Sequence, residues 1–211
     1  MKTGIELDGI KNIIFDFGGV LFEIDYHLPV KAFKDLGFSG FDELYTQAMQ
    51  LEEFDLLETG KISNDAFLDF LRSHVADATK EDVLQAWNCI LLQPLCEEIR
   101  HVRKLRENGY RTFLLSNTNA IHADLFERMI REAMPWEEFQ LAFEHIYYSH
   151  VIGLKKPYPD TFLQVCEWNG LTAHETLFID DSLQHVEGAR SAGLRVHHLK
   201  SDQKISWLMG L

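Results

Sequence analysis

The stretch NIIFDFGGVLF, residues 12–22, decides the fold of this chain. Residues 12–17 have the length and residue types of a buried β-strand, and the apolar run 13–15 within them ends at one carboxylate, Asp16. Gly18 and Gly19 follow at once, and glycines stop a strand and allow a tight turn. A carboxylate at the end of a buried strand is costly to desolvate unless something pairs with it. Asp16 is therefore a candidate functional residue.

The composition is that of a globular protein with an acidic surface. The 211 residues are 46% hydrophobic, and 33 Asp and Glu against 20 Lys and Arg give a net charge of −13. This balance argues against nucleic-acid and anionic-membrane partners, which need a basic face. No apolar stretch is long enough to span a bilayer, and the polar N-terminus does not resemble a secretory signal. We expect a cytoplasmic protein, monomer or homodimer, with three reduced cysteines.

After Pro94 the pattern alternates between helices and strands. We expect strands at residues 110–117, 145–150, 175–182 and 194–199, separated by amphipathic helices at 94–109, 120–133, 158–170 and 183–193. Such alternation predicts an α/β fold, a doubly wound Rossmann-like parallel sheet with helices on both faces. Ligands of these sheets bind beyond the carboxyl ends of the strands.

Between the first strand and this alternating region the spacing is helical. Residues 28–38, 41–60, 63–75 and 79–92 carry apolar positions three and four apart, and Thr79 and Asp82 stand in capping-box positions. Phe67, Leu68, Phe70 and Leu71 are the expected core of this region. The sequence thus predicts a small helical cap domain, residues 23–94, inserted into a core of residues 1–22 and 95–211.

Chemically active residues stand at the carboxyl ends of the predicted strands or in the loops after them. They are Asp16, Ser116, Asn117, Lys155, Lys156, Asp180 and Asp181. A parallel sheet gathers these positions on one edge. Carboxylates suit Mg²⁺, while hydroxyl, amide and ammonium groups suit a phosphoryl group. One carboxylate can attack phosphorus and form an aspartyl-phosphate.

Four segments in this order resemble the four motifs of the haloacid dehalogenase superfamily, most of whose members are Mg²⁺-dependent phosphatases. FDFGGVLF resembles the first motif, LLSNTN the second, GLKKPYPDTF the third and LFIDDS the fourth. The resemblance covers nearly the whole chain, and residues 23–94 resemble the small cap that the family carries between its first two motifs. The amino-acid sequences of these motifs resemble those of a bacterial branch that includes an α-D-glucose-1-phosphate phosphatase.

The resemblance implies a role for each matching residue near the metal. Asp16 is the expected nucleophile and a Mg²⁺ ligand, and Gly18 offers its backbone carbonyl to the ion. Asp181 is expected to bind Mg²⁺ directly. Asp180 either assists through a water molecule or orients Lys156 through a salt bridge.

A second set of residues is expected to hold the phosphate of the substrate. The Ser116 hydroxyl and the Asn117 backbone N–H donate to phosphoryl oxygens, and Lys156 neutralises their charge and restrains Asp16. Lys156 rather than Lys155 is expected to face the site, since it directly precedes the proline of the motif. Gly19 leaves room for the incoming phosphate. The expected function is a Mg²⁺-dependent phosphatase acting on a small phosphorylated metabolite, a sugar phosphate in particular.

Gly18 departs from the family pattern. Most phosphatases of the superfamily have a second aspartate two positions after the nucleophile, which acts as general acid and base. Such help is typically worth about 10²–10⁴ in rate. An anomeric phosphate leaves as a stabilised oxyanion and needs less protonation, so an active phosphatase without this side chain is plausible chemistry.

Three other readings compete with an active phosphatase. A metal-independent 2-haloacid dehalogenase also lacks the second aspartate, but the pair Asp180 and Asp181 argues against it. A mutase needs the missing aspartate, and a phosphonatase needs a cap lysine that forms a Schiff base. A catalytically silent or weakly active protein that binds a phosphometabolite or another protein is the remaining alternative.

The cap is expected to close over the substrate and select it. The candidates at its entrance are Glu23, Asp25, Tyr26, His27 and the segment 58–61. Glu23 or Asp25 could also supply the missing base, although each of these positions is more typical of a structural residue.

Overall fold

The computed structural model describes residues 5–41, 52–75 and 77–208. Five parallel strands form one sheet in the order β5-β4-β1-β6-β7. Their bounds are β1 Asn12–Phe15, β4 Arg111–Ser116, β5 His145–Tyr148, β6 Thr176–Asp180 and β7 Arg195–His198. The predicted doubly wound α/β fold is confirmed, with β1 at the centre of the sheet. In the described ranges no helix is both long and apolar enough to cross a membrane.

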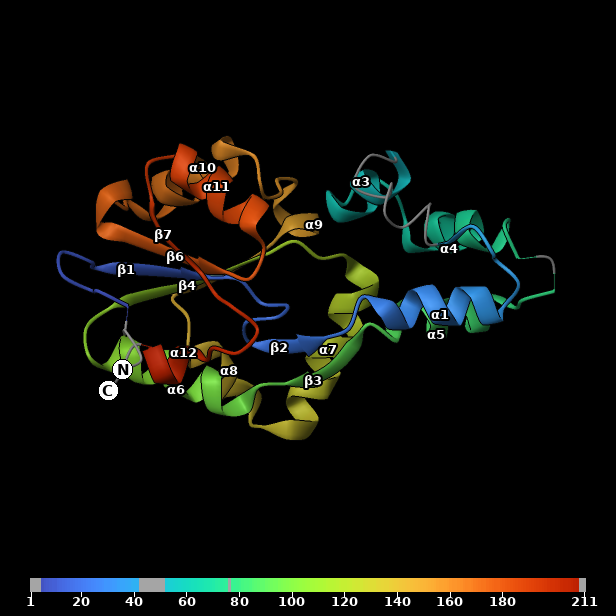
Figure 1. The fold of residues 1–211 in the computed structure, drawn as a ribbon, viewed down its shortest axis with the longest axis horizontal. Coiled ribbons are helices and arrows are strands. Elements are labelled where there is room, and N and C mark those ends of the chain that lie inside the picture. The colour runs from blue at the N-terminus through green and yellow to red at the C-terminus, as the bar shows by residue number, and fades with distance from the viewer. Residues whose placement is uncertain (1–4, 42–51, 76, 209–211) are drawn as a thin grey trace.

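Helices cover both faces of the sheet (Figure 1). One face carries α6 (Cys96–Glu107), α7 (Ala120–Ala133), α8 (Trp136–Leu141) and α12 (Ile205–Leu208), and the other carries α10 (Pro159–Asn169) and α11 (Leu183–Ser191). Two short helices, α9 (Ser149–Ile152) and a 3₁₀ turn at Ala173–Glu175, complete the connections. Successive strand residues point to opposite faces, so Ile13 and Phe15 join one apolar cluster and Ile14 joins the other. This explains why β1 is apolar at every position.

Within the described ranges, four helices form a separate lobe beside the sheet (Figure 1). They are α1 (His27–Asp35), α3 (Glu52–Glu58), α4 (Asn64–Arg72) and α5 (Lys80–Asn88). Their buried cluster includes Phe67, Leu68 and Leu71, with Phe70 packed against it. The Thr79–Asp82 capping box is present at the start of α5. The expected helix at 41–60 lies partly outside the described residues, and the domain boundaries at residues 22 and 95 stay a prediction.

A two-stranded ribbon joins this lobe to the core, where the sequence predicted none. The strands β2 (Phe22–Ile24) and β3 (Leu91–Pro94) pair antiparallel, with Phe22 opposite Pro94. The predicted helix at 79–92 is therefore too long, since α5 ends at Asn88. The apolar run at residues 89–92 continues the helical spacing, but pairing with β2 gives its backbone groups partners in a strand instead.

Candidate active site

The predicted residues converge at the carboxyl edge of the sheet. Asp16 directly follows β1, and its backbone N–H donates to the carbonyl of Ile179 on β6 at 2.9 Å. Ser116 ends β4 and Asp180 ends β6. Asp16, Ser116 and Asp180 are all buried. The apolar run that preceded Asp16 thus fixes this carboxylate between the ends of two neighbouring strands.

Lys156 lies at the centre of the charged groups. Its buried ammonium donates to Asp16 Oδ1 at 2.5 Å and to Asp180 Oδ2 at 2.8 Å. Burial opposes the charged form, but Asp16 and Asp180 together raise the pKa of Lys156. Lys155 points away and forms ion pairs with Asp55 at 2.8 Å and with Glu58 at 3.0 Å. The structure therefore gives the two adjacent lysines different partners, one set in the core and one in the cap.

The side chain of Asn117 holds the backbone of Lys156 in place. Its Oδ1 accepts from the Lys156 N–H at 2.9 Å, and its Nδ2 donates to the Lys156 carbonyl at 2.8 Å. The peptide bond between Lys156 and Pro157 is cis. A second link joins the same two loops, because Ser149 Oγ accepts from the Thr118 N–H at 2.9 Å and donates to its carbonyl. The end of β4 thereby positions the lysine that pairs with Asp16.

Three carboxylates stand close enough to share one cation. Ligand atoms of Asp16, Asp180 and Asp181 all lie within 4.8 Å of one another. Burial, then the charges of Asp16 and Asp180, raise the pKa of Asp181 to about 7, although its side chain is exposed to the cavity. Burial and Asp180 also raise the pKa of Asp16 against the opposing effect of Lys156. The cluster has more negative charge than Lys156 can neutralise.

Asp180 differs from the other two carboxylates because it is surrounded by donors. Besides Lys156, it accepts from the Ser182 N–H at 2.7 Å and contacts His185 Nδ1 at 3.0 Å. Burial works to raise its pKa, but Lys156 and His185 outweigh that effect and lower it to about 2. Asp180 therefore stays ionised and orients Lys156, which was one of its two expected roles.

The two glycines after Asp16 have different surroundings. Gly19 has φ = +73°, and a Cβ there would overlap the carboxylate of Asp181. A Cβ on Gly18 would stand 2.9 Å from Ile24 Cδ1. The close approach at Gly19 thus makes room for a neighbouring carboxylate. The space that a side chain at position 18 would enter holds the end of Ile24.

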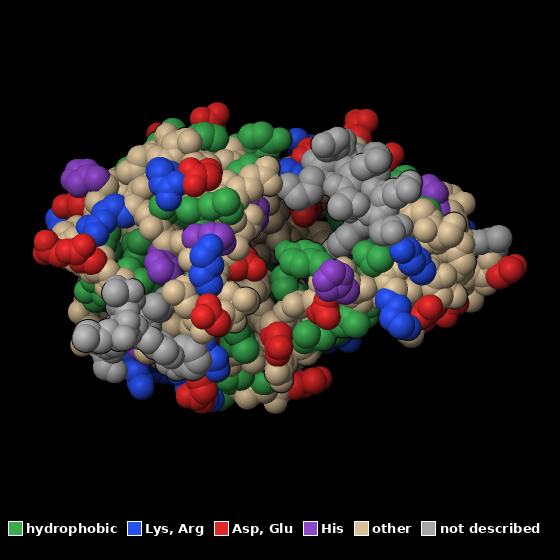
Figure 2. All heavy atoms as spheres, in the orientation of Figure 1, with side chains coloured by type: hydrophobic (Ala, Val, Ile, Leu, Met, Phe, Trp, Pro, Cys, Tyr) green, Lys and Arg blue, Asp and Glu red, His purple; other side chains and the backbone are tan. Residues whose placement is uncertain are grey.

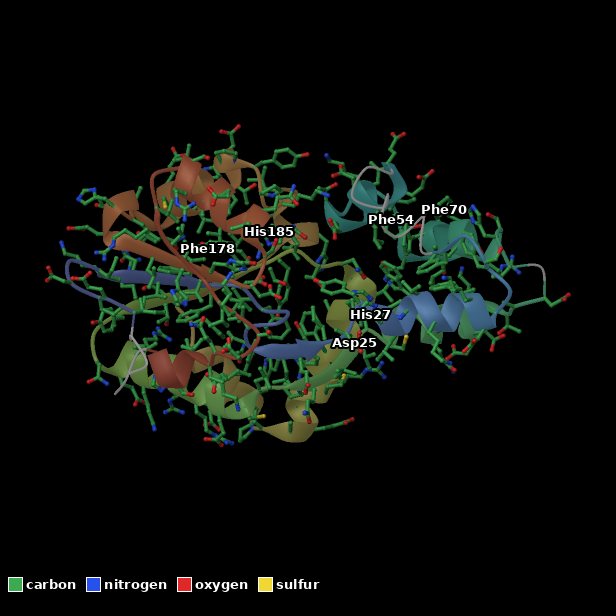
Figure 3. All side chains as sticks on the ribbon, viewed as in Figure 1. Asp25, His27, Phe54, Phe70, Phe178 and His185 are labelled. Atoms are coloured by element: carbon green, nitrogen blue, oxygen red, sulfur yellow. The ribbon has the colours of Figure 1, made fainter. Side chains whose placement is uncertain are left out.

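A cavity of about 430 Å³ opens above these residues, between the core and the cap. Figure 2 shows it as a hollow between the two lobes with hydrophobic side chains along one border. His185 lies on the core side of this opening and Phe54 on the cap side (Figure 3). The core supplies most of the polar lining: Asp16, Ser116, Asn117, Thr118, Asn119, His122, Lys155, Lys156, Asp181, Ser182, Gln184 and His185.

Two of the entrance candidates, Tyr26 and Glu58, line the cavity. Glu23 instead accepts from Gln93 across the β2–β3 ribbon at 2.7 Å. Asp25 accepts from the His27 backbone N–H at 2.8 Å, next to the start of α1 (Figure 3). These contacts give Glu23 and Asp25 structural partners, and neither is among the residues that line the cavity.

Sequence reasoning missed two contacts of the site. It assigned only the backbone N–H of Asn117, whereas the side chain binds both polar backbone groups of Lys156. It gave no role to His185, which lies in the first turn of α11 and reaches back to Asp180. The spacing of five residues between Asp180 and His185 is a signal that could have been read, because a helix that starts directly after a strand returns its first turn toward the strand end.

A comparison with protein-family models now settles the family, since the haloacid dehalogenase-like hydrolase model matches residues 10–193. The chain belongs to the haloacid dehalogenase-like hydrolases. Among curated relatives of this hydrolase, a D-ribitol-5-phosphate phosphatase of Bacteroides thetaiotaomicron is 31% identical over 87% of this chain and 89% of its own. A sesquiterpene phosphatase of Aspergillus oryzae is 28% identical over 90% of this chain and 89% of its own.

Solved structures of similar hydrolases agree with this assignment. A haloacid dehalogenase family enzyme of Bacteroides thetaiotaomicron, in complex with magnesium and inorganic phosphate, is 32% identical. The match covers 94% of this chain and 98% of that chain with a TM-score of 0.81. An L-2-haloacid dehalogenase, RSc1362, shares the fold at 18% identity and a TM-score of 0.58.

The donor set of this haloacid dehalogenase-like hydrolase fits a magnesium ion. All three clustered side chains offer carboxylate oxygens, the ligand type that Mg²⁺ prefers. Burial and then the charges of Asp16 and Asp180 raise the pKa of Asp181, and a divalent cation would favour its ionised form. The structure thus supplies a site whose charge and chemistry suit the ion.

Proposed function

We propose that this protein is a Mg²⁺-dependent phosphatase that hydrolyses a small phosphorylated metabolite through an aspartyl-phosphate on Asp16. One observation carries the proposal: Asp16 lies 2.5 Å from the Lys156 ammonium, within a cluster of three carboxylates at the floor of a cavity. Its motif order, family and phosphatase relatives support the same chemistry.

The residues of the chain divide the work of the first step. The carboxylate of Asp16 attacks phosphorus, a new P–O bond forms, and the bond to the leaving oxygen breaks with its electron pair. Lys156 holds Asp16 in position, while the Ser116 hydroxyl and the Asn117 N–H donate to phosphoryl oxygens. Asp16, Asp181 and the Gly18 carbonyl would hold magnesium, with Asp180 through water, and the ion would offset the negative charge of the phosphoryl group.

Water completes the reaction by cleaving the acyl phosphate, which releases inorganic phosphate and regenerates Asp16. The cap lobe and the cavity it covers exclude bulk water from the first step. Gly18 has no side chain that could act as acid or base in either step. We infer that residue 18 does not protonate the leaving oxygen.

The names of the relatives indicate several classes of phosphorylated substrate. The relatives described above are named for D-ribitol 5-phosphate and for a sesquiterpene, and a glyceraldehyde 3-phosphate phosphatase of Pyrococcus abyssi is 30% identical over 44% of this chain and 36% of its own. The sugar phosphate expected from the sequence is consistent with two of these names and stays a prediction. The expected monomer or homodimer and the cytoplasmic location also stay predictions.

The decisive experiment measures phosphate release from p-nitrophenyl phosphate with magnesium, with a chelator, and in Asp16→Asn. We expect turnover that needs magnesium and falls by roughly 10⁴-fold or more in D16N. Asp25→Asn is the matched control, because the Asp25 carboxylate accepts from the His27 N–H and is not among the residues that line the cavity, so this variant should keep near-wild-type activity.

Each alternative has its own outcome in this assay. Release of halide from a 2-haloacid in the presence of the chelator would identify a dehalogenase instead. Binding of a phosphorylated compound without any phosphate release would identify a silent binder. Turnover that survives in D16N would show that Asp16 is not the nucleophile.

A further inference from the structure

The cap contributes a largely apolar wall to the cavity. Of the described residues, those of the cap that line it are Ile24, Tyr26, Phe54, Glu58, Trp87, Ile90 and Leu91. Glu58 is the one carboxylate in this set, and Lys155 already pairs with it at 3.0 Å. Phe22 and Phe126 of the core continue the same apolar surface. The polar floor therefore belongs to the core, whereas most of the apolar wall belongs to the cap.

The aromatic part of this wall is held in place by its neighbours. Trp87 stacks on the imidazole of His122 with ring centroids 4.9 Å apart and an interplanar angle of 16°. Its ring also meets Phe54 at 5.7 Å and Phe67 at 5.0 Å, both edge to face. A preorganised aromatic surface binds an apolar group without losing side-chain freedom.

His122 adds to the wall as a neutral group. Its Nε2 contacts the Trp87 carbonyl at 3.2 Å and its Nδ1 contacts Asn119 Nδ2 at 3.1 Å. Nε2 is therefore the donor and Nδ1 the acceptor, which leaves neither nitrogen for a ligand. Burial lowers its pKa to about 4, so His122 is uncharged at neutral pH.

The wall stands where the leaving group of a substrate must lie. Phosphoryl transfer requires the attacking and leaving oxygens roughly in line, and Asp16 attacks from the floor. The leaving oxygen therefore points away from Asp16, toward the cap. Ile24, which lines the cavity, occupies the place of a side chain at position 18, with its Cδ1 2.9 Å from the Cβ that Gly18 lacks. The leaving group meets hydrocarbon there.

We propose that the substrate is a phosphate monoester of an aromatic alcohol, a phenol, whose ring packs against the wall formed by Ile24, Trp87 and Leu91. This inference rests on the proposed phosphatase function and narrows its substrate. A sugar would bury several hydroxyls against this wall, and a hydroxyl buried without a partner is unfavourable. A phenol leaves as a stabilised oxyanion, since its pKa is about 10, and so it needs no acid at position 18.

The proposed reaction needs no reactant other than the phosphate monoester and water. Asp16 attacks phosphorus, and the electron pair of the breaking P–O bond departs on the phenolate, which takes a proton from solvent. Water then cleaves the acyl phosphate to inorganic phosphate and restores the carboxylate. The cavity of about 430 Å³ is within the usual range for small-molecule sites, roughly 300–1,000 Å³.

Four phosphate monoesters test two effects separately: the acidity of the leaving group and the contact of an aromatic ring with the wall. Phenyl phosphate and glucose 1-phosphate have the better leaving groups, whereas benzyl phosphate and glucose 6-phosphate are esters of ordinary primary alcohols. Benzyl phosphate and glucose 6-phosphate leave as similar alkoxides, so their ratio of kcat/KM values reports the wall, whereas the ratio for phenyl phosphate and glucose 1-phosphate also includes the better phenolate leaving group. We expect both ratios to favour the ring about tenfold or more. Equal values, or a preference for the sugar in both pairs, would overturn the inference.

Adjacent residues of β3 provide a matched pair of variants. Leu91 lines the cavity opposite Ile24 in the ribbon, whereas Leu92 points to the other face and is 38% exposed. Leu91→Asn should lower the phenyl phosphate to glucose 1-phosphate ratio about five- to tenfold. Leu92→Asn should leave it unchanged. An unchanged ratio in a folded L91N would contradict the inference, and if L91N fails to fold, the wild-type ratios decide it.

Failure of the proposed function would look different. Absence of turnover on all four esters and on p-nitrophenyl phosphate, with magnesium present, would remove the phosphatase itself. Turnover of all of them without preference for the ring would leave the phosphatase standing and remove only the aromatic substrate.

Discussion

At the scale of single residues, two adjacent lysines stand in opposite environments. The ammonium of Lys156 is buried between Asp16 and Asp180, whereas Lys155 pairs with the partly exposed Asp55 and Glu58. Removing one partner of a buried ionic group leaves uncompensated charge and typically costs about 3–5 kcal/mol, while an exposed pair contributes about 0–1 kcal/mol. We expect Lys156→Met to lower the free energy of unfolding by the larger amount and Lys155→Met by the smaller. Urea denaturation measures both, and equal losses would show that Lys156 is not the central counter-ion.

The exposed carboxylate of the cluster predicts how stability depends on pH without magnesium. Asp181 has a pKa of about 7, above its ordinary value of 3.8, so the folded state holds its proton more tightly than the unfolded state. Stability should therefore fall as pH rises from about 4 to 7. Thermal unfolding in a chelator should show this loss, and magnesium or Asp181→Asn should reduce it. A pH profile identical with and without magnesium would argue against an ion at this cluster.

At the scale of elements, α11 packs so closely on the loop that carries Lys156 that one position must be glycine. A Cβ on Gly188 would overlap the carbonyl oxygen of Pro157. We expect Gly188→Ala to destabilise the fold by about 1–3 kcal/mol, as overpacking does, and to lower kcat by displacing Lys156. Ser191→Ala, on an exposed position of the same helix, is the control. Wild-type activity and stability in G188A would show that the loop can move without affecting the site.

The elements also show what the sequence could and could not predict. The strand β1 and the order of strand-end residues were readable because periodicity and glycines mark them locally. The β2–β3 ribbon was not readable, because Leu91–Pro94 continues the helical spacing of α5 and its strand conformation depends on pairing with Phe22–Ile24. The clamp of Asn117 on Lys156 joins residues 39 positions apart, and only the folded chain brings them together. Sequence thus located the floor of the site and two residues of its lining, Tyr26 and Glu58, but not the Asn117 clamp or the apolar residues of the wall.

At the scale of the whole molecule, the net charge of −13 opposes the approach of an anionic substrate. Like charges slow association and weaken binding, and salt screens them over about 10 Å at 0.1 M. We expect kcat/KM for a phosphate monoester to rise about twofold or more between roughly 0.02 and 0.2 M salt at constant free magnesium. Kinetics over this range test it. A steady fall would show that local cations, rather than the overall acidity, govern substrate capture.

The chain leaves the core and returns to it at one place, since Phe22 and Pro94 are register partners in the ribbon. The covalent chain between these two residues thus departs and rejoins at one paired position, while Lys155 and His122 of the core add contacts to Glu58 and Trp87 of the cap. A segment of different length or composition could replace the cap between Phe22 and Pro94 without displacing β1, β4 or β6. Recombination at this position could therefore exchange the cap, which lines the substrate cavity, and leave the catalytic residues of the core unchanged.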